Sequence, residues 1–194
     1  MNRGRPRTFD PDIVLEKAMQ LFWSKGYKAT SLQDLLQATK LSKSSLYESF
    51  GNKQSLFEAA FTRYFDIRAR QMRERLEQAE SPLAFIRECL LFALADIERD
   101  TPRGCMMVNV ANEFSSSDPS VQTLIELATR RSCEVFASAF EQAQTCGVIA
   151  DTQTPASLAF YMQCVMSGLC TQTKSGLARK ELLTVVEQIM ASLR

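Results

Sequence analysis

The stretch Thr30–Lys53 reads TSLQDLLQATKLSKSSLYESFGNK, and it predicts two short helices joined by a tight turn. Thr30 is the expected N-cap of the first helix, because Gln33 follows three residues later as in a capping box. Ser42 is the expected N-cap of the second helix, which has two large apolar residues on one side. Its other side carries small hydroxyl groups, a lysine and a tyrosine. Such a helix suits the major groove of DNA, where these groups can reach phosphates and base edges.

Two amphipathic helices with a polar turn fit many all-α proteins, but the order of residues here is more specific. The matching positions are Phe22, Gly26, Tyr27, Thr30, Leu35, Leu41, Ser42, Lys43, Leu46, Tyr47, Phe50, Lys53 and Leu56. This order resembles the helix-turn-helix of the TetR repressor family. Lys40 and Ser44 stand where that family usually has Gly, and Ser49 stands where it has His. Lys40 must therefore adopt the backbone that Gly would adopt in the turn, at a modest cost in energy.

The resemblance implies an all-α fold of about nine helices in two parts. Residues 1–51 would form an N-terminal arm and a three-helix DNA-binding head, and residues 52–194 a helical effector-binding and dimerisation body. The implied function is that of a ligand-responsive transcriptional regulator, a repressor that leaves a palindromic operator when a small molecule or an electrophile acts on the body. The implied partners are double-stranded operator DNA, a small-molecule effector and a second copy of the chain. The alternative is an all-α small-molecule carrier without DNA binding, which would leave the head unexplained.

The expected DNA contacts lie on the second short helix, on its neighbours and on the arm. The complete set is Arg3, Arg5, Arg7, Thr30, Ser31, Ser42, Lys43, Ser44, Ser45, Tyr47 and Lys53. Lys43, Ser44 and Ser45 would approach base edges, and Thr30, Tyr47 and Lys53 would hold phosphates. Gly and Pro alternate with the arginines of the arm, so the arm can enter a minor groove or remain a basic tail with weak attraction to phosphate.

Charge is distributed unevenly along a chain whose net charge is only +1. Residues 1–64 contain ten Lys or Arg and six Asp or Glu, whereas residues 65–194 contain thirteen and sixteen. A basic head on an acidic body is what a DNA reader with a regulatory part would have. The solvation of surface helices could produce the same imbalance, so it supports the DNA-binding interpretation without establishing it.

Composition excludes several kinds of site. The sequence has no histidine, which removes Ser-His-Asp and Cys-His arrangements and the commonest transition-metal ligand. Its six cysteines include no C-x-x-C pair, so zinc-finger spacing is missing as well. We therefore expect no enzyme activity, no metal and no cofactor. No apolar run approaches the length of a membrane span, and the basic N-terminus lacks an apolar signal region, so we expect a cytoplasmic protein with no membrane partner.

Proline marks the expected helix starts in most of the chain. Pro11, Pro82, Pro102, Pro119 and Pro155 each follow a residue that can cap a helix, and Pro is favoured at the first helical position. The expected helices run over residues 11–25, 82–100, 102–114, 119–144 and 155–172, with a long helix over 52–78 and a last one over 177–193. No strand pattern of useful length and no internal repeat interrupts this series.

The body contains many bulky, soft side chains, and most of them should form its core. Some could line a pocket between helices, which is a usual place for a ligand in a helical bundle and which the resemblance also implies. The candidate pocket residues are Phe65, Phe92, Cys105, Met106, Phe114, Phe136, Phe140 and Met162.

The last two helices are apolar on more than one side, so a second apolar face needs a partner. In the resembled family these helices pair with their copies in a dimer. The expected dimer residues are Leu158, Tyr161, Met162, Val165, Leu182, Val186 and Ile189. A fully buried pair of helices in a monomer is the alternative.

Cys105 follows Arg103-Gly104 at the start of an expected short helix. A helix N-terminus and a nearby arginine both favour the thiolate, which is the reactive form of cysteine. Gly-Cys before an apolar helix also resembles the electrophile-sensing and redox-sensing branch of the family. The hypothesis is that modification of Cys105 releases DNA, and the alternative is an inert, half-buried thiol.

Overall fold

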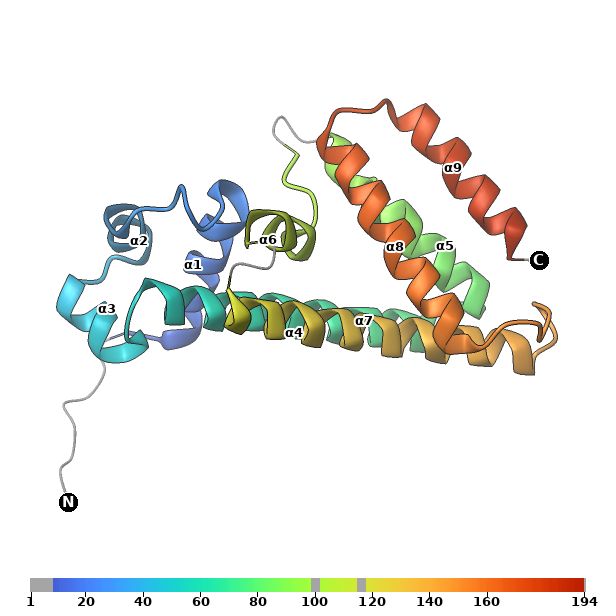
Figure 1. Ribbon diagram of the computed structural model, residues 1–194, viewed down its shortest axis with the longest axis horizontal. Helices are drawn as coiled ribbons and strands as arrows, with labels where there is room; N and C mark the ends of the chain where they lie inside the picture. The colour runs from blue at the N-terminus through green and yellow to red at the C-terminus, as the bar shows by residue number, and fades with distance from the viewer. Residues whose placement is uncertain (1–8, 99–101, 115–117, 194) are drawn as a thin grey trace, which may run out of the picture. The chain divides into compact units, whose positions relative to one another are not determined.

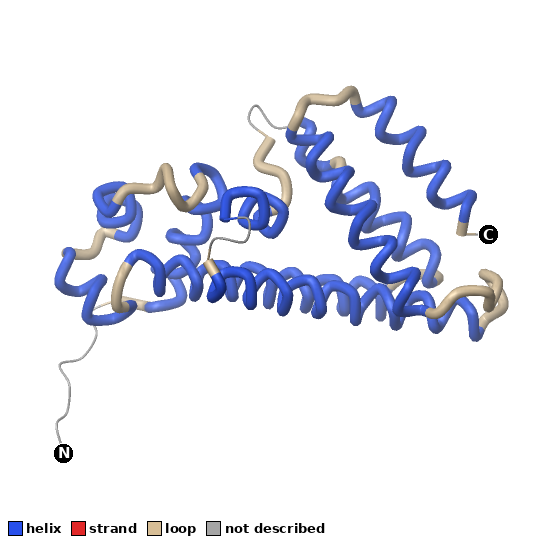
Figure 2. The backbone as a smooth tube through the Cα atoms, in the orientation of Figure 1, coloured by secondary structure: helices blue, strands red, loops and turns tan. Residues whose placement is uncertain are grey.

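The computed structural model describes residues 9–98, 102–114 and 118–193, and within them it is helical, with no strand (Figures 1 and 2). The helices are α1 (Pro11–Lys25), α2 (Leu32–Thr39), α3 (Lys43–Phe50), α4 (Lys53–Gln78), α5 (Pro82–Ala93), the 3₁₀ turn η1 (Ala95–Glu98), α6 (Met106–Phe114), α7 (Pro119–Thr145), α8 (Pro155–Lys174) and α9 (Arg179–Ser192). The all-α expectation is confirmed.

Four of the five proline starts are confirmed. The caps of α1, α5, α7 and α8 each accept a hydrogen bond from a backbone N–H of the first turn, and a proline follows each cap. The start at Pro102 is wrong, because α6 begins at Met106. The predicted helix over 82–100 is also shorter, since α5 ends at Ala93 and η1 follows it. Gly104, with φ +64°, belongs to the segment before α6.

The chain divides into two compact units, Met1–Tyr64 and Phe65–Arg194. The first unit contains α1, α2, α3 and the beginning of α4. The domain boundary predicted from the sequence, between residues 51 and 52, lies earlier, at the end of α3. The predicted boundary stays a prediction about function. The compact unit extends beyond it because apolar residues in the first turns of α4 complete its core.

Aromatic rings form the centre of the first unit. Phe57, from α4, is 1% exposed and its ring contacts Phe22 edge-on at 5.2 Å between centroids. The Tyr27 ring lies 4.9 Å from it, and Phe61 is stacked one turn further along α4. Leu35 of α2 and Leu46 of α3 are fully buried in the same unit. Each short helix therefore places a fully buried leucine in the unit whose centre these aromatic rings form.

The first turn of α2 is capped one residue later than the sequence pattern indicated. Ser31 is the N-cap, its hydroxyl accepts from the Asp34 N–H, and the Asp34 carboxylate accepts from the Ser31 N–H at 2.9 Å. This is a complete capping box with Asp at the third position. Thr30 is instead fully buried, and its hydroxyl donates to the Gly26 carbonyl at 2.6 Å. The predicted Thr30–Gln33 capping box is wrong because Thr30 closes the preceding turn.

Lys40 takes the left-handed conformation that its position requires. It ends α2 with φ +61° and ψ +24°, and among the described residues no other non-glycine has a positive φ. Its N–H donates to the Leu36 carbonyl at 3.0 Å, which ends the helix. The expectation that lysine would adopt the backbone of the family's glycine is confirmed.

We expect the Lys40→Gly variant to be more stable than the natural chain. Glycine adopts this backbone without the Cβ clash, and the left-handed conformation costs an ordinary residue about 1 kcal/mol. Part of this gain is offset because glycine has more freedom in the unfolded chain. The midpoint of the unfolding transition of the head, followed by Trp23 fluorescence, should rise. Lys28→Gly, at an exposed position with negative φ, is the control and should not be stabilised.

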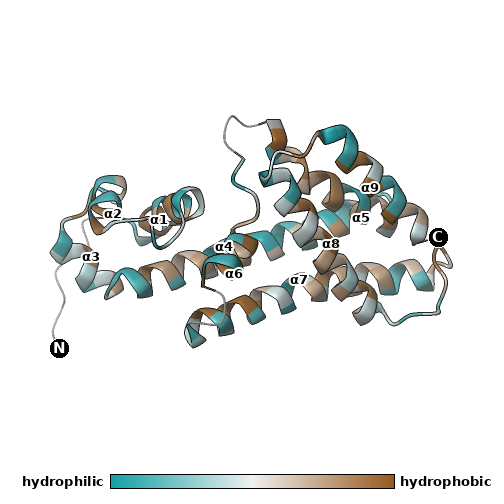
Figure 3. Ribbon diagram, turned by 45° about the horizontal axis from the view of Figure 1, so that its top comes forward, coloured by the Kyte–Doolittle hydropathy of each residue, from teal (hydrophilic) through white to brown (hydrophobic). Residues whose placement is uncertain are grey.

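The second unit has its own core, built where α5, α7, α8 and α9 pack together. Its largest fully buried side chains are Phe85, Ile86, Leu90, Leu94, Phe136 and Phe140. Arg87 of α5 and Glu187 of α9 form an ion pair at 2.6 Å, and the Thr173 hydroxyl of α8 donates to the Ala93 carbonyl at the end of α5. Polar and apolar residues alternate along these helices in Figure 3, as expected for helices with one buried face.

No helix in the described part of the chain is both long and apolar enough to cross a bilayer.

Candidate DNA-binding surface and thiol site

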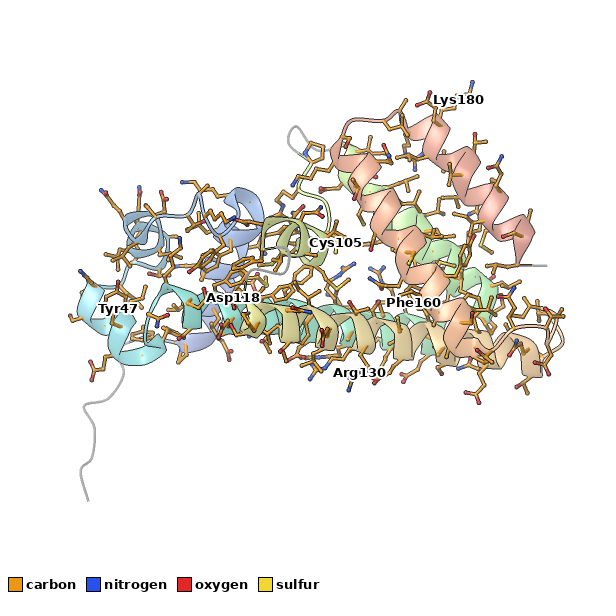
Figure 4. The ribbon with its side chains drawn as sticks, in the orientation of Figure 1. Tyr47, Cys105, Asp118, Arg130, Phe160 and Lys180 are labelled. Atoms are coloured by element: carbon orange, nitrogen blue, oxygen red, sulfur yellow. The ribbon has the colours of Figure 1, made fainter. Side chains whose placement is uncertain are left out.

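The outer face of α3 carries the predicted DNA-reading residues. Lys43, Ser44 and Tyr47 are exposed, Ser45 is partly exposed, and Leu46 between them is fully buried. Tyr47 lies on this helix in Figure 4, with 37% of its surface accessible. Leu46 anchors α3 to its own unit and leaves the polar side chains outside. Within the first unit, then, the polar flank of α3 is uncovered.

The side chains at the start of α3 are held in place by one another. Ser42 is the N-cap, as predicted, and its hydroxyl accepts from the Ser45 N–H at 3.2 Å. The hydroxyls of Ser44 and Ser45 both lie within 3.0 Å of the Ser42 hydroxyl. The Lys43 ammonium lies 5.7 Å from the centre of the Tyr47 ring, one turn along the helix. A cation, three hydroxyls and a phenol thus share one face in partly fixed positions.

A second basic position lies at the start of α4. Lys53 is the first residue of this helix, and the Asn52 side chain before it accepts from the Ser55 N–H at 2.9 Å. The Lys53 ammonium lies 4.3 Å from the centre of the Tyr27 ring, a cation–π contact that fixes its direction. The remaining N–H groups of the first turn and the ammonium together can hold an anion.

Ion pairs hold the helices of the head together. Lys25 of α1 contacts Asp34 of α2 at 2.8 Å, and Arg63 of α4 contacts Asp12 and Glu16 of α1 at 2.9 and 3.4 Å. The Lys25 ammonium, followed by the Ser31 N–H and hydroxyl, lowers the pKa of Asp34 to about 2. A lowered carboxyl pKa contributes stability above its usual value of 3.8, and that contribution is lost as the pH falls towards 2.

The remaining predicted DNA contacts have different outcomes. Thr30 is buried and its hydroxyl is already used by the Gly26 carbonyl, so the prediction that it holds a phosphate is corrected. Arg3, Arg5 and Arg7 lie outside the described residues. Ser31 is exposed at the N-cap of α2, where its hydroxyl also contacts the Asp34 carboxylate at 2.8 Å.

A second site surrounds Cys105, which lies before α6 and not in its first turn as predicted (Figure 4). The Cys105 carbonyl accepts from the Asn109 N–H at 3.0 Å, so Cys105 occupies the N-cap position of α6. The Asp96 carboxylate of η1 accepts from the backbone N–H groups of Arg103 and Gly104. It thereby holds the two residues that precede Cys105.

The Asn109 side chain connects this segment to α8. Its amide donates to the Arg103 carbonyl at 2.8 Å, and its carbonyl accepts from the Lys174 ammonium at 2.9 Å. Gly104 lies so close to α8 that an added Cβ would be 3.5 Å from the Cys170 carbonyl and from the Lys174 side chain. The segment is thus attached to η1 at one point and to the end of α8 at another.

Cys170 of α8 is the direct neighbour of Cys105. The two thiols form a side-chain hydrogen bond, and this contact together with burial raises the pKa of Cys170. Sequence reasoning identified Cys105 and missed Asp96, Asn109, Cys170 and Lys174. The Arg-Gly-Cys turn marked Cys105, but no local pattern pairs it with a cysteine on a helix so distant in the sequence.

The predicted effector-pocket residues lie in different surroundings. Phe136, Phe140 and Met162 are part of the main core of the second unit, and their assignment to a pocket stays a prediction. Phe92 is 38% exposed, with the guanidinium groups of Arg68 and Arg75 at 4.4 and 4.6 Å from its ring centre. This ring is a surface cation–π site. The remaining candidates apart from Cys105, which are Phe65, Met106 and Phe114, are buried.

An ion pair lies beside Phe65 in the second unit. The Arg131 guanidinium of α7 is 5.2 Å from the centre of the Phe65 ring and pairs with the Asp66 carboxylate of α4. Arg68 is close enough to Cys170 to lower its pKa, although the hydrogen bond with Cys105 and burial raise that pKa more strongly. One arginine therefore lies beside Phe65 and another within electrostatic reach of Cys170, a feature that the apolar candidate list did not contain.

Most of the predicted dimer residues face inward. Leu158, Met162, Leu182, Val186 and Ile189 belong to the core of their own subunit, so their assignment to a dimer interface is corrected. Val165 packs partly against that core, and Tyr161 is 42% exposed. Phe160, at 61% exposed (Figure 4), and Val185 of α9, at 40%, are exposed apolar residues that the sequence analysis did not name. Both helices are apolar on two sides, and the sequence pattern alone did not show which side is buried.

Comparison with known proteins places these features in a family. Residues 14–60 match the profile of bacterial regulatory proteins of the tetR family, and residues 82–176 match the tetracyclin repressor-like C-terminal domain. The HTH-type transcriptional repressor ComR of Escherichia coli (strain K12) is 31% identical over 186 residues, which cover 95% of this chain and 89% of ComR.

Solved structures agree with the fold. A cysteine mutant of the TetR family transcriptional regulator CifR, complexed with 26-bp double-strand operator DNA, has a TM-score of 0.84 and 31% identity and covers 98% of this chain and 100% of its own. The reduced form of Escherichia coli NemR has a TM-score of 0.84 at 19% identity, covering 92% of this chain and 93% of its own, which shows a shared fold. Given the matched head, the matched body and the similarity to ComR over most of both chains, this protein belongs to the TetR family of bacterial transcriptional regulators.

Proposed function

We propose that the chain is a homodimeric repressor that reads a partly palindromic operator with α3 and leaves it when an effector or an electrophile acts on the second unit. One observation carries the proposal: the polar face of α3 is exposed while Leu46 fixes the helix from behind. The operator complex of CifR supports the DNA part, because that protein is 31% identical to this chain. The protein would act where the chromosome is, in the cytoplasm, and by binding and not by catalysis.

Within this proposal the residues of the head divide into two roles. Lys43, Ser44 and Ser45 stand in the first turn of α3, the part of a recognition helix that contacts base edges in this class of motif. Lys53 and Tyr47 would contact phosphates, Lys53 together with the N–H groups of α4. Ser31 and Ser42 are N-caps whose hydroxyls already serve their own helices, so we assign them to positioning.

Replacing Lys53 by Ala should weaken binding to all DNA sequences alike. One phosphate contact fewer in each of the two heads reduces the slope of log K against log salt by about 1 per head, roughly 2 for the dimer, because fewer condensed counterions are released. Fluorescence anisotropy on the DNA upstream of the gene, with salt varied, measures this slope. Lys43→Ala should instead change the preference among base-pair variants of the operator, with a loss of about 1–3 kcal/mol at the contacted pair.

Lys28→Ala is the matched control, since Lys28 is an exposed lysine of the head outside α3 and the start of α4. It should leave sequence preference unchanged. An unaltered salt slope in Lys53→Ala would contradict the assignment of Lys53 to a phosphate. Equal losses on all operator variants in Lys43→Ala would contradict its assignment to a base edge.

The dimer would form through the outer sides of α8 and α9. Phe160, Tyr161, Cys164 and Gly168 form an exposed stripe at helical spacing on α8, and Val185 is exposed on α9. Gly168 has no atom within 4 Å of an added Cβ, so another helix can approach closely there. TetR-family regulators are dimeric, and a two-fold dimer allows two short helices to read two half-sites at a fixed spacing.

The response would start at the thiol site. Cys105 lies at the N-cap of α6 and is partly exposed, and we propose that electrophiles alkylate its sulfur. The Cys105→Ser chain should bind the operator normally and keep binding after treatment with an electrophile such as N-ethylmaleimide at low excess. Cys146→Ser, which removes an exposed thiol after α7, should still be released like the natural chain. Equal release of the Cys105→Ser chain would contradict this role.

A further inference from the structure

Two cysteines from distant parts of the chain meet in the second unit. Cys105 at the start of α6 and Cys170 in the last turns of α8 form a thiol–thiol hydrogen bond. All six cysteines are reduced in the structure, and Cys105 and Cys170 are each partly exposed. The pair is therefore in contact and within reach of small solutes.

The backbone segments that carry this pair lie close together. Gly104, directly before Cys105, is so near α8 that a Cβ there would lie 3.5 Å from the Cys170 carbonyl. The Asp96 carboxylate holds the N–H groups of Arg103 and Gly104, and Asn109 connects Arg103 to Lys174. Thiols in contact on closely packed backbones can be bridged without large movement, since a disulfide spans only a few ångströms between Cα atoms.

The structure also indicates which sulfur reacts first. The hydrogen bond with Cys105 and burial raise the pKa of Cys170, which disfavours its thiolate. Cys105 instead lies at the N-cap of α6, where a helix N-terminus favours the thiolate. The attacking sulfur is accordingly that of Cys105, and Cys170 is the second thiol that resolves its oxidised form.

We propose that Cys105 and Cys170 form a reversible intramolecular disulfide when the protein meets a hydroperoxide, and that this bond lowers operator affinity. The Cys105 sulfur attacks the peroxide O–O bond, which gives the sulfenic acid and releases an alcohol, or water from hydrogen peroxide. The Cys170 sulfur then attacks the sulfenic sulfur, which forms the S–S bond and releases water. The two thiols lose two electrons in total and the peroxide gains them. A dithiol reductant reverses the reaction.

The bond would connect the start of α6 to the end of α8. At present these elements are joined by the Asp96, Asn109 and Lys174 contacts, which depend on the position of the Arg103–Cys105 segment. Moving Cys105 from hydrogen-bond distance to bond distance of Cys170 displaces that segment and α6 with it. The effect on DNA depends on the proposed function, whereas formation of the bond does not.

The bond-forming test uses the full chain with Cys146→Ser and Cys164→Ser, which removes two exposed thiols that could link separate molecules. The operator-binding comparison keeps Cys164, which lies on the proposed dimer face. One equivalent of hydrogen peroxide should remove two thiols per chain, and peptide mapping without reductant should find Cys105 joined to Cys170. Adding Cys170→Ser should leave Cys105 as a sulfenic acid that dimedone traps. Adding Cys133→Ser, which removes another half-buried thiol, should leave the bond intact.

Two results would overturn the proposal. If Cys170 remains open to alkylation after Cys105 has been oxidised, the disulfide does not form. If the disulfide forms and the reduced and oxidised chains bind the operator equally, the regulatory part is wrong. Failure of the reduced chain to bind any upstream DNA would contradict the proposed function, and the thiol count would still decide on the bond. We expect an affinity ratio of at least tenfold between the reduced and oxidised chains.

Discussion

A chain with Phe160→Asp should be a monomer that no longer binds its operator specifically. Phe160 is 61% exposed on α8 and contributes nothing to the core of its own subunit, so the variant should fold normally. In a dimer the new carboxylate would be buried in an apolar interface without a partner, which costs several kcal/mol for each copy. Sedimentation should then give a mass near 21.9 kDa in place of twice that value.

Loss of the dimer has a larger effect on DNA than loss of one contact. A single head can contact only one half-site of the operator. Specific binding exceeds non-specific binding by about 10³-fold or more, and most of this difference in affinity requires contacts with both half-sites. Anisotropy on the operator should show binding that no longer differs from binding to unrelated DNA. Val148→Asp is the matched control, because Val148 is 43% exposed in the segment after α7 and belongs to neither α8 nor α9. If the Phe160→Asp chain remained a dimer, the proposed interface on α8 and α9 would be wrong.

The sequence predicted features that depend on neighbours along the chain. Capped prolines located the starts of α1, α5, α7 and α8, and the Ser-Lys-Ser-Ser run located the start of α3. Such signals work because the cap, the first-turn N–H groups and the proline are within four residues of one another. The helix start predicted at Pro102 is wrong because the Asp96 carboxylate, which belongs to another element, accepts hydrogen bonds from the backbone N–H groups of Arg103 and Gly104.

Features that depend on packing could not be predicted from the sequence. Thr30 and Ser31 can both cap α2. Ser31 does so because the Thr30 hydroxyl donates to the Gly26 carbonyl instead. On α8 the two sides are both apolar, so Met162 was assigned to the interface although it is completely buried in its own subunit. The contact between Cys105 and Cys170 depends on how α6 packs on α8, which no periodicity in the sequence describes.

A chain with Phe57→Ala should lose the folded head while the second unit remains folded. Phe57 is 1% exposed and contacts the rings of Phe22, Tyr27 and Phe61, which leaves little room for the surrounding residues to close around a smaller side chain. Truncating a buried phenylalanine to alanine costs about 3–5 kcal/mol. A unit of this size has a stability of the same order, so the loss is sufficient to unfold it.

The sequence supplies a probe for this result, because its single tryptophan lies in the head. Trp23 contacts the Tyr64 ring edge-on at 5.1 Å, so its fluorescence reports on the first unit, whereas the circular dichroism of all helices reports mainly on the second. In Phe57→Ala the fluorescence transition should move to a much lower denaturant concentration than the main circular dichroism transition. Phe92→Ala, which removes an exposed ring in the second unit, should leave the Trp23 transition unchanged. If both signals shift together in Phe57→Ala, the two units unfold as one, and the head does not depend separately on its aromatic centre.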